Sequence, residues 1–206
     1  SSDVCSSDLK LPSGGNYWRD DALSIPANGE IGVMSMTTKD EITLRTPDAL
    51  MNGQGVVSVI ESCCPNIHDA WGMPGIDVDA TLIAIRIASY GHDMNVSSTC
   101  PNCKHTNDNT VDLTQALGQI TMPNYNNLVE DTELTIKLKP QTYFSVNKAN
   151  TIAYKEQRIL DVINQEGVSI EDKETNLRAV TDELIELNLD TLTASTDYIL
   201  MSDGTK

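Results

Sequence analysis

The sequence predicts an α+β protein that is mostly helical, with a small antiparallel β component and a cysteine-containing ribbon. Apolar residues that recur every three or four positions indicate helices, most clearly at residues 77–90. Segments that alternate apolar and polar residues indicate strands at residues 30–36 and 133–139. Cys100 and Cys103 stand two residues apart in a turn between two strand-like segments, which defines the ribbon.

The composition is strongly acidic. The 206 residues include 14 Lys and Arg against 30 Asp and Glu, which gives a net charge of −16. Binding to nucleic acid requires clustered basic residues that neutralise phosphates, so we expect no nucleic-acid partner. The acidic surface favours basic protein surfaces or simply keeps the protein soluble. No uninterrupted run of 18 apolar residues occurs, so we expect no membrane-spanning helix.

The chain divides into three parts of different character. The first nine residues, SSDVCSSDL, nearly repeat themselves and have no amphipathic pattern, so we expect a non-native or disordered leader. Residues 10–122 form a mixed α/β region that contains the ribbon, and residues 123–206 form a strand followed by helices. The mixed region opens with an arm rich in Gly, Pro and polar residues, anchored by Tyr17 and Trp18.

The mixed region continues with short elements. After the strand at 30–36, Thr37 with Asp40 three residues later predicts a capping box and a helix that ends near Arg45. Residues 56–63 read as a helix or a buried strand, and we favour the helix. Residues 64–75 contain two prolines and two glycines and predict an ordered loop.

The most clearly predicted helix covers residues 77–90, and Gly91 stands where a C-terminal cap belongs. Apolar residues surround nearly the whole helix, which predicts a central, buried position. Residues 93–98 and 110–113 then read as the two strands of the ribbon. Residues 113–117 predict a short helix.

The last region is predicted to be largely helical. Beyond the strand at 133–139, three- and four-residue spacing predicts helices over residues 146–163 and 173–187. We also expect residues 190–201 to be helical.

Cys100 and Cys103 are the main chemical feature. The chain has five cysteines and no secretory signal, so a disulfide framework is not expected. Two thiolates this far apart can chelate Zn²⁺ from a turn, and zinc takes four sulfur or nitrogen ligands in a tetrahedron. The pair supplies two ligands, and we predict that Cys64 and His105 supply the rest. The other candidate ligands are Cys63, His92, His68 and residues of a partner chain.

Two alternatives to a zinc site remain. The cysteines of the ribbon could be free thiols in a turn, with no metal. A redox pair is disfavoured, because that motif usually begins a helix after a strand, whereas strand-like residues lie on both sides here.

We expect no enzyme activity. The sequence contains no GxSxG, P-loop or GxGxxG motif. His68 and Asp69 beside Trp71 imitate a catalytic pair, but a loop histidine next to an acid is more often ordinary packing. Asp77 and Asp79 are expected to begin a helix or to be solvated, and not to act as an acid/base pair.

Several short segments carry a resemblance to a known family. These segments span about residues 11–115. Their order and spacing argue against chance similarity. The segments are Leu11-Pro12-Ser13-Gly14-Gly15 with Tyr17, Gly29-Glu30-Ile31, Met36-Thr37, Lys39-Asp40-Glu41, Cys64-Pro65, residues 76–80, residues 82–91, and Cys100-Pro101 with Cys103. Together they resemble the baseplate hub subunit family of T-even-like contractile-tailed bacteriophages. Lys104 departs from the pattern, since knuckles of this kind often carry glycine after the second cysteine.

The resemblance implies a structural or assembly protein that binds other baseplate hub or tail proteins, and self-association is compatible with it. It implies a location in the host cytoplasm during assembly and in the tail baseplate of the virion. Two other functions compete with this one. A zinc-ribbon adaptor in host takeover or transcription requires a basic face near the ribbon, and a metallo-hydrolase requires three protein ligands with an open position.

Overall fold

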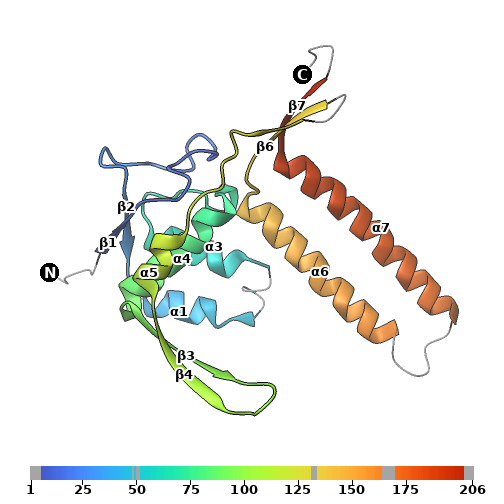
Figure 1. The fold of residues 1–206 in the computed structure, drawn as a ribbon, viewed down its shortest axis with the longest axis horizontal. Helices are drawn as coiled ribbons and strands as arrows, with labels where there is room; N and C mark the ends of the chain where they lie inside the picture. The colour runs from blue at the N-terminus through green and yellow to red at the C-terminus, as the bar shows by residue number, and fades with distance from the viewer. Residues whose placement is uncertain (1–5, 48, 50–51, 131–133, 164–169, 202–206) are drawn as a thin grey trace. The chain divides into compact units, whose positions relative to one another are not determined.

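The computed structural model describes residues 6–47, 49, 52–130, 134–163 and 170–201 (Figure 1). The chain forms two compact units, Ser1–Pro123 and Asn124–Lys206. This division lies one residue from the boundary expected between the mixed region and the helical region. The mixture of helices with small antiparallel sheets confirms the α+β class.

The core of unit 1 is formed by two strands and two helices: β1 (Ser6–Leu9), β2 (Ile31–Met34), α3 (Gln54–Cys63) and α4 (Gly75–Tyr90). The strands pair antiparallel, with Leu9 opposite Ile31. The largest fully buried apolar side chains include Ile31 and Val33 of β2, Ile60 of α3, Ile85 of α4, and Met73 of the loop before α4. Burial of such aliphatic side chains is the main stabilising contribution in a chain with only 4% aromatic residues.

The start of the fold differs from the expectation. Residues 6–9, which the sequence analysis assigns to the leader, form β1, and Leu9 is buried. The strand was missed because its register comes from β2, which lies more than twenty residues further along the chain. The other part of the expected leader, residues 1–5, lies outside the described residues.

The expected helix starts and stops are found. Helix α1 (Thr38–Leu44) begins with the capping box predicted from Thr37 and Asp40: the Asp40 backbone N–H donates to Thr37 Oγ1 at 3.4 Å, and the Thr37 N–H donates to Asp40 Oδ2 at 2.8 Å. Residues 56–63 fall within α3, as favoured. Helix α4 ends at Gly91, which has a φ of 85°.

The ribbon follows α4 directly. β3 (Asp93–Thr99) and β4 (Thr106–Asp112) pair antiparallel in an unbroken register from Asp93–Asp112 to Thr99–Thr106. Helix α5 (Leu113–Gln119) begins where β4 ends and Leu113 anchors it in the core. Figure 1 shows the hairpin extending from the helices of unit 1.

Unit 2 combines a small sheet with a pair of helices. β5 (Leu128–Glu130), β6 (Leu134–Leu138) and β7 (Thr196–Met201) form an antiparallel sheet in the order β5-β6-β7. Helices α6 (Tyr143–Ile163) and α7 (Ile170–Ser195) pack side by side. Ile152 and Val180 are their most buried described side chains.

The prediction that residues 190–201 are helical is wrong for its second half. Helix α7 ends at Ser195 and the chain continues as β7, which pairs with β6. Along β7, exposed residues alternate with half-buried ones: Asp197, Ile199 and Met201 are exposed, and the residues before each of them are half-buried. This period of two is a strand signal that the acidic, helix-like residues before it obscure.

Candidate functional site

The two cysteines of the ribbon lie at the tip of the β3–β4 hairpin, and we call Cys100 and Cys103 the tip cysteines. The backbone N–H of Cys100 donates to His105 O at 2.9 Å, and the N–H of Lys104 donates to Cys100 O at 2.9 Å. Lys104 has a φ of 58°, a left-handed conformation that glycine adopts more easily. The chain therefore makes the tight turn around the cysteines even though lysine replaces the glycine that is common there.

The turn gathers hydrogen-bond donors around one sulfur. The backbone N–H groups of Cys103 and Asn102, together with the Cys103 side chain, lower the pKa of the Cys100 thiol. Two sulfurs bound to one tetrahedral Zn²⁺ at about 2.3 Å lie about 3.8 Å apart, which is within the range of a hydrogen bond between sulfurs. A zinc site at the tip would need the two sulfurs at about this separation. Cys103 is exposed and Cys100 is partly exposed.

The other two predicted zinc ligands are not gathered at the tip. Cys64 is fully buried in the core at the end of α3, and burial raises the pKa of its thiol to about 12. His105 is an exposed neighbour of the turn. In the described part of the chain, no three His, Cys, Asp or Glu side chains come together as a metal site. The four-ligand set therefore stays a prediction, of which the structure brings together the tip cysteines alone.

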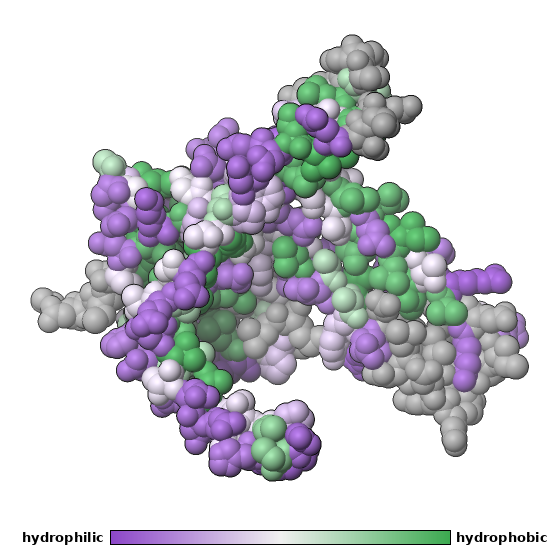
Figure 2. Space-filling model, viewed as in Figure 1, coloured by the Kyte–Doolittle hydropathy of each residue, from purple (hydrophilic) through white to green (hydrophobic). Residues whose placement is uncertain are grey.

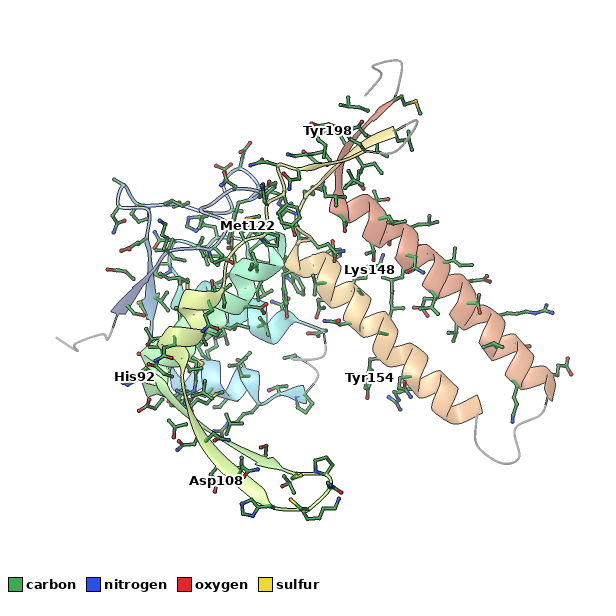
Figure 3. All side chains as sticks on the ribbon, in the orientation of Figure 1. His92, Asp108, Met122, Lys148, Tyr154 and Tyr198 are labelled. Carbon is green, nitrogen blue, oxygen red and sulfur yellow. The ribbon has the colours of Figure 1, made fainter. Side chains whose placement is uncertain are left out.

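The hairpin is acidic. Residues 93–112 contain Asp93, Asp108 and Asp112, with Lys104 as the one Lys or Arg. Figure 3 labels Asp108 on the hairpin and His92 at its base, where His92 Nε2 lies 3.5 Å from Asp93 Oδ1. An adaptor that binds nucleic acid through the ribbon would need the opposite charge.

A second cluster, which the sequence analysis missed, lies at the start of α4. Asp77 is completely buried and accepts three hydrogen bonds: from Ser13 N at 2.9 Å, from Ser13 Oγ at 2.5 Å and from Trp18 Nε1 at 2.8 Å. Burial raises the pKa of Asp77, and the bonds from Ser13 and Trp18 oppose this rise. The cluster fastens the N-terminal arm to the helix, so the arm is an integral part of unit 1.

One feature of the sequence could have indicated this buried cluster. Asp77 is an acid at the head of a helix that is otherwise almost entirely apolar, and it was expected to begin the helix or to be solvated. It does lie in the first turn, but it is not solvated. A carboxylate in that position needs donors from elsewhere in the chain, and Ser13 within the Ser-Gly-Gly turn supplies them.

The histidine of the loop before η1 (Ala70–Gly72) contacts a serine hydroxyl. His68 Nε2 lies 2.9 Å from Ser24 Oγ. The neighbouring carboxylate of Asp69 pairs with Arg19 and accepts from the Trp71 backbone N–H. The Asp69 carboxylate is thus engaged with Arg19 and with the Trp71 backbone.

Unit 2 exposes a row of large apolar side chains on α7. Ile185, Leu189 and Leu192 are 55%, 60% and 65% exposed, and their spacing of four and three residues places them on one face of the helix. We call these three residues the α7 stripe. The hydropathy surface shows apolar atoms gathered over the α6–α7 pair (Figure 2).

The opposite face of α7 meets α6. Lys148 of α6, labelled in Figure 3, forms an ion pair with Asp190 of α7. A cavity of about 230 Å³ opens between the two helices. It is lined by Phe144, Ser145, Lys148, Leu187, Asp190, Thr191, Thr193 and Ala194. Because α6 occupies this side of α7, the α7 stripe faces away from it.

Within the residues that the structure describes, each helix is too short or too polar to cross a membrane.

Comparison with known proteins gives one result. A family model described as "T4 bacteriophage base plate protein" matches residues 7–199. No curated protein and no solved structure matches the chain significantly. The family match covers both units, whereas the resemblance noted from the sequence was limited to the first. With nearly the whole length matched, the chain belongs to the T4 bacteriophage base plate protein family.

Proposed function

We propose that this protein is a hub subunit or hub-assembly factor of a contractile-tail baseplate, and that it acts by binding other baseplate proteins without catalysing a reaction. Membership of the base plate family supports a structural role in the phage tail. The observation that carries the binding role is the α7 stripe, three large apolar side chains that remain more than half exposed.

Exposed apolar rows of this kind are typical of helix-in-groove or helix–helix binding. Burying three such side chains in an interface contributes roughly 1.5–3 kcal/mol each before the costs of association. Single exposed leucines are common on protein surfaces, but three at helical spacing form a continuous contact line. The stripe therefore has the geometry to bind one face of a partner helix.

The charge of α7 restricts the partner further. The helix contains seven acidic residues and two basic ones, for a net charge of −5. A partner segment that places lysines or arginines beside its apolar face would pair with these carboxylates and would associate faster at low salt. The proposed occupant of the stripe is a basic amphipathic helix of another baseplate protein.

Co-expression with the hub proteins of the same phage tests this proposal. The tagged wild-type chain should recover a hub protein, and Leu189→Asp should lower the affinity at least tenfold, because it places a charge at the centre of the stripe. Asn188→Asp is the matched control: it adds the same charge at the next residue, which is exposed and polar, and should leave binding unchanged.

Recovery of no hub protein would refute the binding role, and equal recovery with Leu189→Asp would refute the α7 stripe as its site. An inventory of purified virions then separates the two forms of the proposal. A hub subunit is present in the finished particle, whereas an assembly factor appears only in intermediates from infected cells.

A further inference from the structure

The β3–β4 hairpin buries little of its own surface. Apart from Met94 and Asp112, its strand residues are exposed on both faces. A two-stranded hairpin with so little burial is marginally stable in water. A cross-link at the tip would therefore contribute strongly to its order, and the tip is where the two thiols lie.

The tip already has the local geometry of a metal-binding turn. The Cys100 backbone N–H donates to His105 O at 2.9 Å, and the Lys104 N–H donates to Cys100 O at 2.9 Å, so the chain closes a tight turn around both cysteines. Two cysteines at this spacing in one turn can chelate a single metal ion. The left-handed conformation of Lys104 turns the chain back toward β4, and the turn leaves Cys103 exposed and Cys100 partly exposed.

Two thiolates leave a zinc ion with half of its ligands. Zn²⁺ in structural sites takes four ligands, and in the described part of this chain no third His, Cys, Asp or Glu side chain joins the tip cysteines in a group that could hold a metal. Cys64 is excluded as the structure stands, since it lies in the core as a buried thiol. The missing ligands must therefore come from outside the chain's own hairpin.

We propose that the hairpin tip is one half of a zinc site, completed by the same tip of a second copy of this chain. A twofold axis through the metal would bring together four cysteine sulfurs, and four thiolates in a tetrahedron are an ordinary ligand set for structural zinc. Each thiol that binds releases its proton to the solvent, so one Zn²⁺ and four thiols give a tetrathiolate centre and four protons.

The charges of the chain make this association dependent on the metal. Each copy has a net charge of −16 and its hairpin is acidic, so two copies repel one another without a cation between them. The tetrathiolate centre has a charge of −2, and one Lys104 from each tip offsets it. The inference does not depend on the α7 stripe, which belongs to the other unit.

The test measures mass and metal content of the full chain, purified with a reductant that does not bind metal. We expect a 22.5 kDa monomer after chelation. Addition of zinc chloride should double the mass, with one zinc per two chains. Cobalt(II) in place of zinc should give the visible spectrum of a four-thiolate tetrahedral centre.

Four variants, one of them a control, locate the ligands. Cys100→Ser and Cys103→Ser should each abolish the mass change and lower zinc content at least tenfold, with an unchanged circular dichroism spectrum. Asn102→Ala is the matched control between them: it keeps its backbone N–H and should dimerise like the wild type. His105→Ala should also dimerise normally if all four ligands are sulfur.

Four results would overturn the proposal. The first is one zinc per monomer, and the second is no zinc uptake. The third is a zinc-independent dimer. The fourth is loss of dimerisation with His105→Ala, which would place nitrogen in the centre.

Discussion

Replacing Asp77 with alanine should destabilise unit 1 by roughly 2–4 kcal/mol. The carboxylate accepts three hydrogen bonds, two from Ser13 and one from Trp18. A hydrogen bond to a charged group contributes about 1.5–3 kcal/mol, and donors left without an acceptor lose that contribution. Part of this lost stability is offset, because the variant no longer buries a carboxylate. Burial of the carboxylate is unfavourable, as the raised pKa of Asp77 indicates.

Urea unfolding followed by tryptophan fluorescence measures this effect in unit 1 alone, since Trp18 and Trp71 are the two tryptophans of the chain. The midpoint should fall by about 1–2 M. Asp79→Ala is the control, because Asp79 lies on the same helix with an exposed side chain and should change stability by less than about 0.5 kcal/mol. Equal midpoints for the Asp77 and Asp79 variants would refute the reasoning.

The pH dependence of the free energy of unfolding is a second, independent test of the Asp77 cluster. The folded protein raises the pKa of Asp77 above its ordinary 3.8, so the folded state holds this proton more tightly than the unfolded state. The stabilisation from that proton is complete below pH 3.8 and is lost as the pH rises through the folded-state pKa. Asparagine at this position does not titrate, so the free energy of unfolding of Asp77→Asn has no such pH dependence. The difference in stability between wild type and this variant should therefore become smaller as the pH rises.

Three other perturbations have clear expected outcomes. In a Cys5→Ser background, the tip cysteines should react with Ellman's reagent in the native protein, whereas Cys63 and Cys64 should react only on unfolding, because burial raises their pKa to about 11 and about 12. Burial raises the pKa of Asp40, but hydrogen bonds from Thr37 outweigh this effect and hold the pKa below 3.8. The stability that Asp40 contributes should therefore be lost as the pH falls below 3.8. In Asp40→Asn, the free energy of unfolding should depend less on pH in this acidic range. Gly15→Ala should lower the urea midpoint, because Gly15 has a φ of 82° and an added Cβ would clash with the Cδ1 methyl of Ile25; an unchanged midpoint would contradict this expectation.

Local signals predicted most elements of the fold. The capping box at Thr37, the glycine at 91 and the alternation in residues 133–139 each depend on neighbours within a few positions, and the structure confirms the elements they predict. Two of the missed strands depend on distant partners, whereas β5, which was also missed, pairs with the neighbouring β6. β1 takes its register from β2, and β7 takes its register from β6, about sixty residues earlier in the chain.

Prediction of the candidate sites is limited in the same way, because local spacing predicts a turn but not its distant partners. The spacing of the tip cysteines predicted a turn, and the turn is present, because four residues are enough to specify it. The assignment of Cys64 as a partner ligand required knowledge of which parts of the chain meet. The same holds for Asp77, whose donors lie more than fifty residues away. Residue types indicated the chemistry in both cases, but only the fold shows which groups lie together.

The segments that carry the family resemblance therefore argue for a division of roles within the molecule. Ser13 in the first segment and Asp77 in the segment at 76–80 meet in one buried cluster, so these motifs specify how unit 1 folds and offer little surface to a partner. Buried hydrogen-bonded groups cannot bind another protein without unfolding. The proposed binding role therefore falls to groups that the fold leaves exposed, and the α7 stripe and the tip cysteines are two such sets. Because they lie in different units, changes to one should leave the other intact, which makes hub binding and zinc-dependent pairing separable by mutation.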